Sequence, residues 1–313
     1  MPEQAFVCLC ALPLVRSVEQ ETNGKDENML HSHKGRFTVA MAALITAVPL
    51  LSGADHGPVF GLATPTNPQG GWSLDLGVNG RGGTGGVASA LEAELGYGVT
   101  QNIKLTVSGP LVFEPDPYPR STVTTNTPVS GDFSGLAWWR FQKKDFEGKR
   151  FESTAVGGIL VPGPQQETGV YRGLNSGVGY LVGAVTGVAS RSQYVWVGSS
   201  YQRYTESKGD RRPDLLTYTA VYGYRPQSWR TDYPRWDWRI FGEFTGERAG
   251  TLQRQMIDLG GTQANQMFLG PSVLGVYRAI GVEAGIQFPV YRDVGPFFPK
   301  ERYRFAVNFA YFF

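Results

Sequence analysis

The sequence predicts an all-β protein, a transmembrane antiparallel up-and-down β-barrel of about 12 strands. Three observations predict it: period-2 alternation along most of the chain, an export signal near the N-terminus, and a closing strand that ends in phenylalanine. Alternation of apolar and polar residues is the period of a strand, because successive side chains point to opposite faces. In a membrane barrel only every second residue of a strand meets lipid, so the strands need not be continuously apolar.

The composition favours strands and turns over helices. The 313 residues include 41 Gly, 18 Phe, 15 Tyr and 7 Trp, and only 18% of the residues are charged. Beyond the N-terminal region, no apolar run approaches the roughly 20 residues that a membrane-spanning helix needs. The formal net charge is +2 and the sequence has no dense basic tract, so we expect no nucleic-acid partner.

The N-terminal region predicts export. Residues 37–51 are apolar, a positive flank at Lys34 and Arg36 precedes them, and the small residues 52–54 follow. A positive flank, a short apolar core and small residues at the exit are typical of a secretory signal peptide. A buried or membrane helix is the alternative, but the stretch is short for a span.

The chain therefore divides into four predicted segments. We expect an upstream extension of the reading frame, or a disordered segment, at 1–28, and a signal peptide at 29–54. A periplasmic N-terminal lead-in at 55–70 and the outer-membrane barrel at 71–313 complete the chain. Location in the cell outer membrane follows from this arrangement.

The last strand shows the clearest alternation. Arg304, Ala306, Asn308 and Ala310 share one face. The other face carries six large apolar or aromatic residues and runs to the final residue: Tyr303, Phe305, Val307, Phe309, Tyr311 and Phe313. This ending resembles the C-terminal signal by which outer-membrane barrels are recognised for insertion. We therefore expect outer-membrane lipid and the barrel-assembly machinery as partners.

The same alternation predicts an even number of strands, as in bacterial single-chain barrels. The twelve predicted segments are 71–80, 87–98, 102–113, 131–142, 150–161, 176–188, 192–203, 214–225, 235–246, 266–277, 279–289 and 301–313.

The connections between these segments alternate in length. Those after the second, sixth and tenth strands are tight, and those after the fourth and eighth are of middle length. Most of the others are longer and rich in Pro, Gly and charge, as at 114–130 and 247–264. Short periplasmic turns alternating with long external loops are typical of outer-membrane barrels. Either of these two long loops could fold inward and close the lumen.

The faces opposite the apolar rows carry charged residues, which we predict to line a water-filled lumen. They are Asp75, Glu92, Glu94, Lys104, Arg140, Asp237, Arg239, Glu243, Glu283 and Arg304. Their mixed signs predict weak ion selectivity. Paired carboxylates such as Glu92 and Glu94 could act as acid and base in glycoside hydrolysis. The nearby basic residues favour lumen electrostatics instead.

Several familiar chemistries are missing. The three histidines, His31, His33 and His56, precede the first strand, so a Ser–His hydrolase in the barrel would lack its base. Both cysteines lie within 1–28, and no zinc or haem-attachment pattern is present. The glycine cluster 80–86 lacks the ending of a phosphate loop and predicts a hairpin turn. We therefore expect no cofactor, no metal and no enzymatic activity.

Aromatic residues near strand ends predict interfacial girdles. They are Trp138, Trp139, Trp236, Trp238 and Tyr311.

Three stretches, read together, resemble a known family. The first is His56–Pro58 with the later Gly71–Gly77, the second is Leu95–Leu105, and the third combines Gly270–Ser272 with Ala284–Val290 and the closing strand. They resemble the outer-membrane transporter-like barrels grouped as "MetA-pathway of phenol degradation". The resemblance extends over 56–313 and implies an outer-membrane barrel that passes small, aromatic or hydrophobic compounds.

The function predicted is that of an outer-membrane channel or transporter for passive passage of a small solute, aromatic or hydrophobic ones included. The alternative is a non-conducting structural or surface-interaction barrel that acts through its external loops. A lumenal enzyme is a third hypothesis, which the missing histidine disfavours. A soluble secreted β-protein is the alternative at the level of the fold.

Overall fold

The structure is a computed structural model that divides into two units, Met1–Pro49 and Leu50–Phe313. It describes residues 57–83, 86–112, 122–123, 128–129, 132–162, 174–175, 177–230, 234–296 and 300–313. The described residues all belong to the second unit. The predicted segments 1–28 and 29–54 lie outside the described residues, as does most of the loop 114–130.

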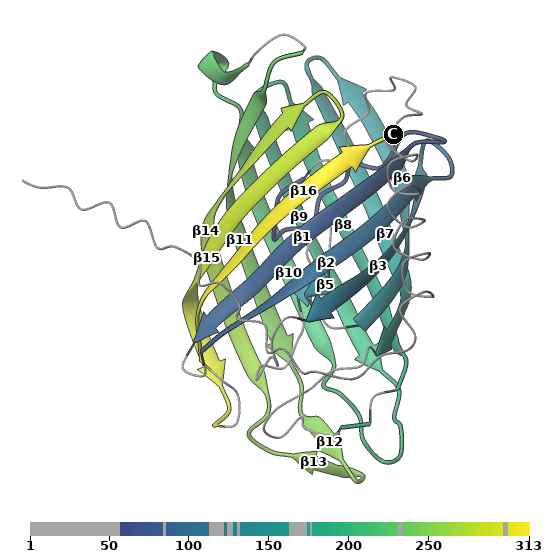
Figure 1. Ribbon diagram of the computed structural model, residues 1–313, viewed down its shortest axis with the longest axis vertical. Coiled ribbons are helices and arrows are strands. Elements are labelled where there is room, and N and C mark those ends of the chain that lie inside the picture. Colours follow the sequence, from purple (N-terminus) through teal and green to yellow (C-terminus); the bar gives the residue numbers. More distant parts are fainter. Residues whose placement is uncertain are drawn as a thin grey trace, which may run out of the picture. The chain divides into compact units, whose positions relative to one another are not determined.

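Twelve strands form a closed antiparallel barrel, which confirms the predicted fold (Figure 1). The barrel strands are β1 (Trp72–Gly83), β2 (Gly86–Gly98), β3 (Ile103–Val112), β6 (Asp132–Phe146), β7 (Lys149–Pro162), β8 (Gly179–Ser190), β9 (Gln193–Tyr204), β10 (Leu215–Tyr224), β11 (Asp237–Ala249), β14 (Ala264–Tyr277), β15 (Ile280–Val294) and β16 (Glu301–Phe312). Each strand pairs with its neighbours along the chain, and β16 pairs with β1 to close the barrel. Closure leaves no barrel edge unpaired, which is what a hydrocarbon solvent requires.

The connections between barrel strands contain short strands and a short helix. β4 (Thr122–Val123) pairs with β5 (Pro128–Val129), and β12 (Leu252–Arg254) pairs with β13 (Ile257–Leu259). A 3-10 helix, η2 (Gln227–Trp229), lies between β10 and β11. Within the described part of the chain, no helix is both long and apolar enough to cross a membrane.

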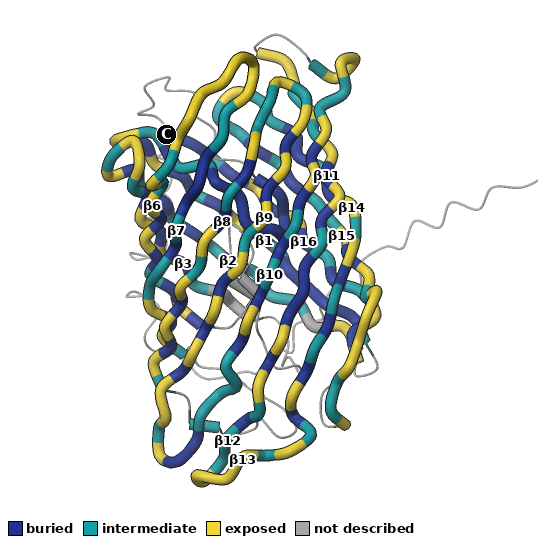
Figure 2. Tube along the Cα trace, turned by 180° about the vertical axis from the view of Figure 1, so that it is seen from behind, coloured by how far each residue is buried: buried dark blue, intermediate teal, exposed yellow. Residues whose placement is uncertain are grey.

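The wall separates an apolar exterior from a polar interior. Exposed and buried residues alternate along the strands (Figure 2). Large apolar side chains point outward, and Val182 and Trp139 are exposed over 60% and 57% of their surfaces. Soluble proteins seldom expose so much contiguous apolar surface, whereas a lipid-facing wall requires it.

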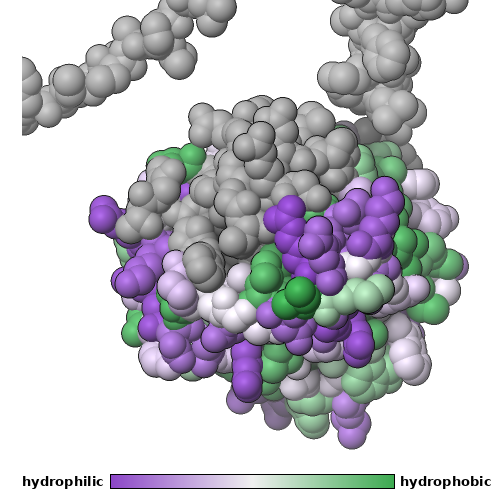
Figure 3. Space-filling model, turned by 90° about the horizontal axis from the view of Figure 1, so that it is seen from below, coloured by the Kyte–Doolittle hydropathy of each residue, from purple (hydrophilic) through white to green (hydrophobic). Residues whose placement is uncertain are grey.

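The two ends of the barrel differ as expected. Two-residue turns join β6 to β7 and β14 to β15, at the end where the C-terminus lies (Figure 1). The β12–β13 hairpin lies at the opposite end, where hydrophilic patches stand beside hydrophobic ones (Figure 3). By the convention of outer-membrane barrels, the end with the short turns is periplasmic. The connection after the fourth barrel strand, β6, was expected to be of middle length, but it is as short as the turn between β14 and β15.

Several strands extend beyond their predicted ends. β1 continues through the glycines to Gly83, β11 reaches Ala249 and β15 reaches Val294. Above the lipid both faces of a strand meet water, so alternation fades from the sequence while the backbone ladder continues. The register of β14 and β15 shifts next to Pro289, the kind of irregularity where a strand tolerates proline.

The girdle prediction is wrong for Trp138. Its indole is buried inside the barrel, only 4% exposed, whereas its neighbour Trp139 points outward. Adjacent residues of a strand face opposite sides, so only one of the two could belong to a girdle. Trp236 and Trp238 are exposed and stack with ring centroids 5.5 Å apart.

Candidate functional site

The chain ahead of β1 lies inside the barrel. Residues 57–64 are all buried, and their partners are inward-facing residues of β7, β9, β10 and β11. We call Gly57–Asn67 the lumen segment. This placement differs from the periplasmic lead-in expected for 55–70. The sequence does not predict this position inside the barrel, because a short Gly- and Pro-rich stretch has no periodicity from which its environment could be inferred.

Glu243 of β11 binds the inner part of the lumen segment. Its carboxylate accepts hydrogen bonds from the backbone amides of Val59 at 2.9 Å, and of Phe60 and Gly61 at 2.7 Å each. The hydroxyl of Ser272 donates to the same carboxylate. A buried carboxylate is costly unless hydrogen bonds compensate it, and consecutive amides form a concave anion site. Glu243 therefore holds the segment at three successive residues.

Other inward side chains bind the rest of the segment. The amide of Leu62 donates to Thr219 at 3.2 Å, and the hydroxyl of Thr154 donates to the carbonyl of Thr64 at 3.0 Å. The indole of Trp196 donates to the Thr64 hydroxyl at 3.1 Å. Leu62 also packs in the largest apolar cluster of the interior. This side of the lumen is thus filled by protein.

Two glycines of the wall leave space for the segment. A Cβ on Gly285 would lie 2.7 Å from the ring of Phe60, and a Cβ on Gly198 would lie 3.2 Å from the side chain of Leu62. Any larger residue at Gly285 would therefore displace Phe60.

All ten predicted lumen residues lie on the inward-facing rows of their strands. They fall into groups rather than a single ring. Asp75, Glu92, Glu94 and Glu283 belong to β1, β2 and β15, and we call them the acidic wall. Lys104 of β3 lies 3.9 Å from Glu94. In the order of the closed barrel, this wall is across from β9. The lumen segment contacts β9 at Thr64 and β15, a strand of the wall, at Phe60.

A second group contains Arg304 and residues that the sequence analysis missed. The Arg304 guanidinium binds both Glu247 and Glu301, and Arg81 pairs with Glu301 at 3.1 Å. The guanidinium also lies 3.7 Å from the ring centroid of Phe268. Arg81 and Glu247 were assigned to connections, because the strands were expected to end before them.

The third group, at the periplasmic mouth, contains Arg140, Asp237 and Arg239. Arg140 pairs with Glu152 at 2.9 Å, and Arg239 pairs with Asp237 at 3.2 Å. Glu152 was also missed, since the faces of its strand do not separate cleanly in the sequence.

Asp210 joins three external connections. Its carboxylate accepts hydrogen bonds from the amide and side chain of Asn175 and from the amide of Gln255, at 2.9 to 3.0 Å. These amides, that of Asn175 first, hold the pKa of Asp210 below its ordinary value. Asp132 forms a second external contact and binds both Arg212 and the hydroxyl of Tyr204. Among the described residues, no His, Cys, Asp or Glu cluster could hold a metal ion.

Comparison with solved structures shows what this barrel is similar to. An outer membrane channel from Pseudomonas putida F1 aligns with a TM-score of 0.58 at 13% identity, over 83% of this chain and 100% of that one. The NanC porin aligns with a TM-score of 0.47 at 9% identity, over 76% of this chain and 98% of that one. No protein-family model and no curated protein matches the sequence. The first likeness shows the fold alone, a closed barrel shared with an outer membrane channel, which agrees with the fold that the sequence resemblance predicted.

Proposed function

We propose that this chain is an outer-membrane channel for passive passage of a small solute, and that its lumen segment narrows the passage. The observation that carries the proposal is a closed barrel with an apolar exterior and charged residues inside. A polar interior allows water and a small solute to enter, as in porins. Here the acidic wall and Lys104 provide a polar surface inside the barrel.

The proposed solute is a small molecule, and the proposed class includes aromatic and hydrophobic compounds. The family resemblance of the sequence supports this class. Export through the predicted signal peptide 29–54, and insertion directed by the row from Tyr303 to Phe313, belong to the same proposal.

One observation favours the second candidate, a non-conducting barrel that acts through its external loops. The lumen segment is buried along Gly57–Thr64 and packs against β9, β15 and β16, so it extends across the interior. A segment held this firmly could block the passage altogether. The external contacts of Asp210 and Asp132 would then order the surface that binds a partner.

Single-channel recording on the mature chain 55–313 in a planar bilayer distinguishes the two. We expect small, discrete current steps, because the segment narrows the lumen. A folded protein that stays silent in every recording, with and without a voltage ramp, would contradict the channel and favour the surface-interaction barrel.

A further inference from the structure

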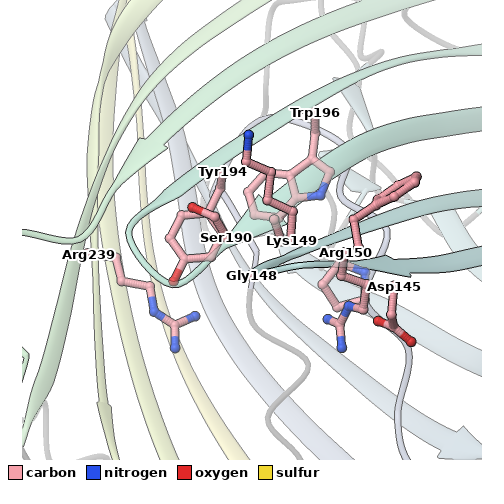
Figure 4. Close-up of a pocket in the computed structure, with 11 residues that line it drawn as sticks. Asp145, Gly148, Lys149, Arg150, Ser190, Tyr194, Trp196 and Arg239 are labelled. Atoms are coloured by element: carbon pink, nitrogen blue, oxygen red, sulfur yellow. The ribbon is translucent and has the colours of Figure 1, made fainter.

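We propose that the periplasmic mouth holds a binding site for small aromatic carboxylates. It lies between the β6–β7 turn, the β8–β9 turn and β11, where a pocket of about 520 Å³ opens (Figure 4). The inference rests on the channel function proposed above, since it names the solute class that the channel takes. Such a volume is within the range of small-molecule sites.

Two aromatic rings supply a flat apolar surface in this pocket. Tyr194 and Trp196 stack with ring centroids 5.5 Å apart and an interplanar angle of 16°. They are only 9% and 4% exposed, so neighbouring side chains hold both rings in place. An aromatic solute can add to such a stack in an offset or edge-on arrangement.

The periplasmic mouth carries a net positive charge, because two of its carboxylates each pair with two arginines. Glu152 lies 2.9 Å from Arg140 and 3.3 Å from Arg150. On the other side of the pocket, Asp237 lies 2.6 Å from Arg225 and 3.2 Å from Arg239. Each set combines two guanidinium groups with one carboxylate, and therefore carries one net positive charge.

The lining of the pocket is itself net positive. Of the described residues, none forms an ion pair with Lys149, and Asp145 is the one acidic member of the pocket lining against three basic ones. Figure 4 shows Arg239 on one side of the aromatic pair and Arg150 on the other. The Nε atom of Arg239 is buried, and among the described residues it has no hydrogen-bond partner. A carboxylate is the natural acceptor for such a donor.

A second pocket next to the first is also lined by basic residues. It has a volume of about 470 Å³, shares Pro65 and Arg150 with the first, and is lined by Arg140 and Lys143. Its described lining residues include no carboxylate. The acidic wall, on β1, β2 and β15, is across the barrel from the first pocket. A concave site with one sign of charge concentrates counter-ions, so this side of the mouth favours an anion.

Isothermal titration of the folded mature chain in detergent tests the site without requiring conduction. We expect benzoate to bind saturably, and the neutral analogue benzyl alcohol to bind at least about tenfold more weakly, because it lacks the charge that the arginines receive. Cyclohexanecarboxylate keeps the charge but not the flat ring, so its affinity should fall between the two. Equal affinity for benzoate and benzyl alcohol would overturn the proposal.

Substitutions then locate the site. Arg239→Gln and Lys149→Gln should each weaken benzoate binding by about tenfold. The matched control Arg191→Gln removes a charge from the exposed β8–β9 turn outside the pocket, and should change nothing. Equal losses in all three variants would mean a diffuse charge effect, which would contradict the site. Arg239→Lys, which keeps the charge, should retain most of the affinity and guards against a folding defect at Arg239.

Bilayer recordings separate failure of the site from failure of the channel. Benzoate added on the periplasmic side should interrupt the current in the wild type, and should interrupt it less often in Lys149→Gln at the same concentration. Saturable binding in a silent protein would support the site and contradict the channel. Current steps without benzoate binding would support the channel and contradict the site.

Discussion

Glu243 keeps a carboxylate inside the barrel because the chain itself supplies the donors. Three consecutive backbone amides and one hydroxyl surround it. The role of Glu243 is therefore to hold the lumen segment in its position. The sequence could predict that Glu243 faces inward, since alternation fixes the face. It could not predict the partner, because backbone amides leave no trace in the sequence.

Replacing Glu243 with glutamine should loosen the lumen segment. Gln is similar in shape but has no charge and only one acceptor oxygen, so the docking of 57–61 should weaken by about 3 kcal/mol. We expect higher single-channel conductance with more frequent transitions. Glu283→Gln is the matched control, since it removes a buried charge from the acidic wall, where Glu283 accepts a hydrogen bond from Asn308. Unchanged traces in Glu243→Gln would show that Glu243 does not control the passage.

Arg304 is the residue on which the second charged group depends. Arg304→Met keeps much of the side-chain volume but leaves Glu247 and Glu301 with fewer partners in a buried site. Removing one member of a buried ion pair typically costs about 3 to 5 kcal/mol. We expect a lower midpoint of urea unfolding, measured by loss of the compact form in gel electrophoresis. Arg302→Met, on the exposed face of the same strand, should leave the midpoint unchanged, and an equal decrease in both variants would contradict the role of the buried pair.

At the scale of the elements, alternation located all twelve strands but not their ends. The pattern is strong where one face meets lipid, as in Tyr303–Phe313, and weak where both faces meet water. Gly80–Gly83 reads as a turn in the sequence because glycine marks turns, yet these residues continue β1. Their pairing with β16 and β2 is a property of the whole barrel, which local propensity does not report.

The external connections should respond to pH through Asp210. Because its pKa is lowered in the folded protein, its bonds stabilise the connections above the ordinary value of about 3.9 and are lost as the pH falls through the lowered value. The predicted mature chain has no cysteine, so Ile257→Cys carries a single spin label on β13. We expect the label to stay immobile from neutral pH to about pH 4 and to gain mobility only below it.

Asp210→Ala supplies the matching test. It should make the label at position 257 mobile at neutral pH and abolish the transition. Asp258→Ala removes an exposed carboxylate from the same hairpin and should preserve the wild-type profile. A transition that persists in Asp210→Ala would assign the pH response to another group.

At the scale of the whole molecule, different parts of the chain close the barrel and fill its lumen. The barrel closes through β1 and β16, and the amide of Trp72 donates to the carbonyl of Phe313 at 2.8 Å. The lumen segment takes part in none of these ladders. It attaches instead to inward side chains: Thr154 and Trp196 donate hydrogen bonds to Thr64, and Glu243 accepts hydrogen bonds from the amides of residues 59–61. The sequence could establish closure, because strand count and ending are local patterns, whereas occlusion depends on contacts across the lumen.

This separation predicts that the barrel folds without the segment. We expect a mature chain that lacks 55–66 and carries Glu243→Gln, so that no buried carboxylate is left without its amide donors, to remain a heat-resistant compact species in detergent. Its conductance should exceed that of the wild type severalfold, since the segment then no longer fills part of the lumen beside β7 to β11. Loss of the compact species would mean that the segment is part of the core. A compact species with wild-type conductance would mean that the narrowest point lies elsewhere, at the external end, and would direct attention to the loops that Asp210 holds together.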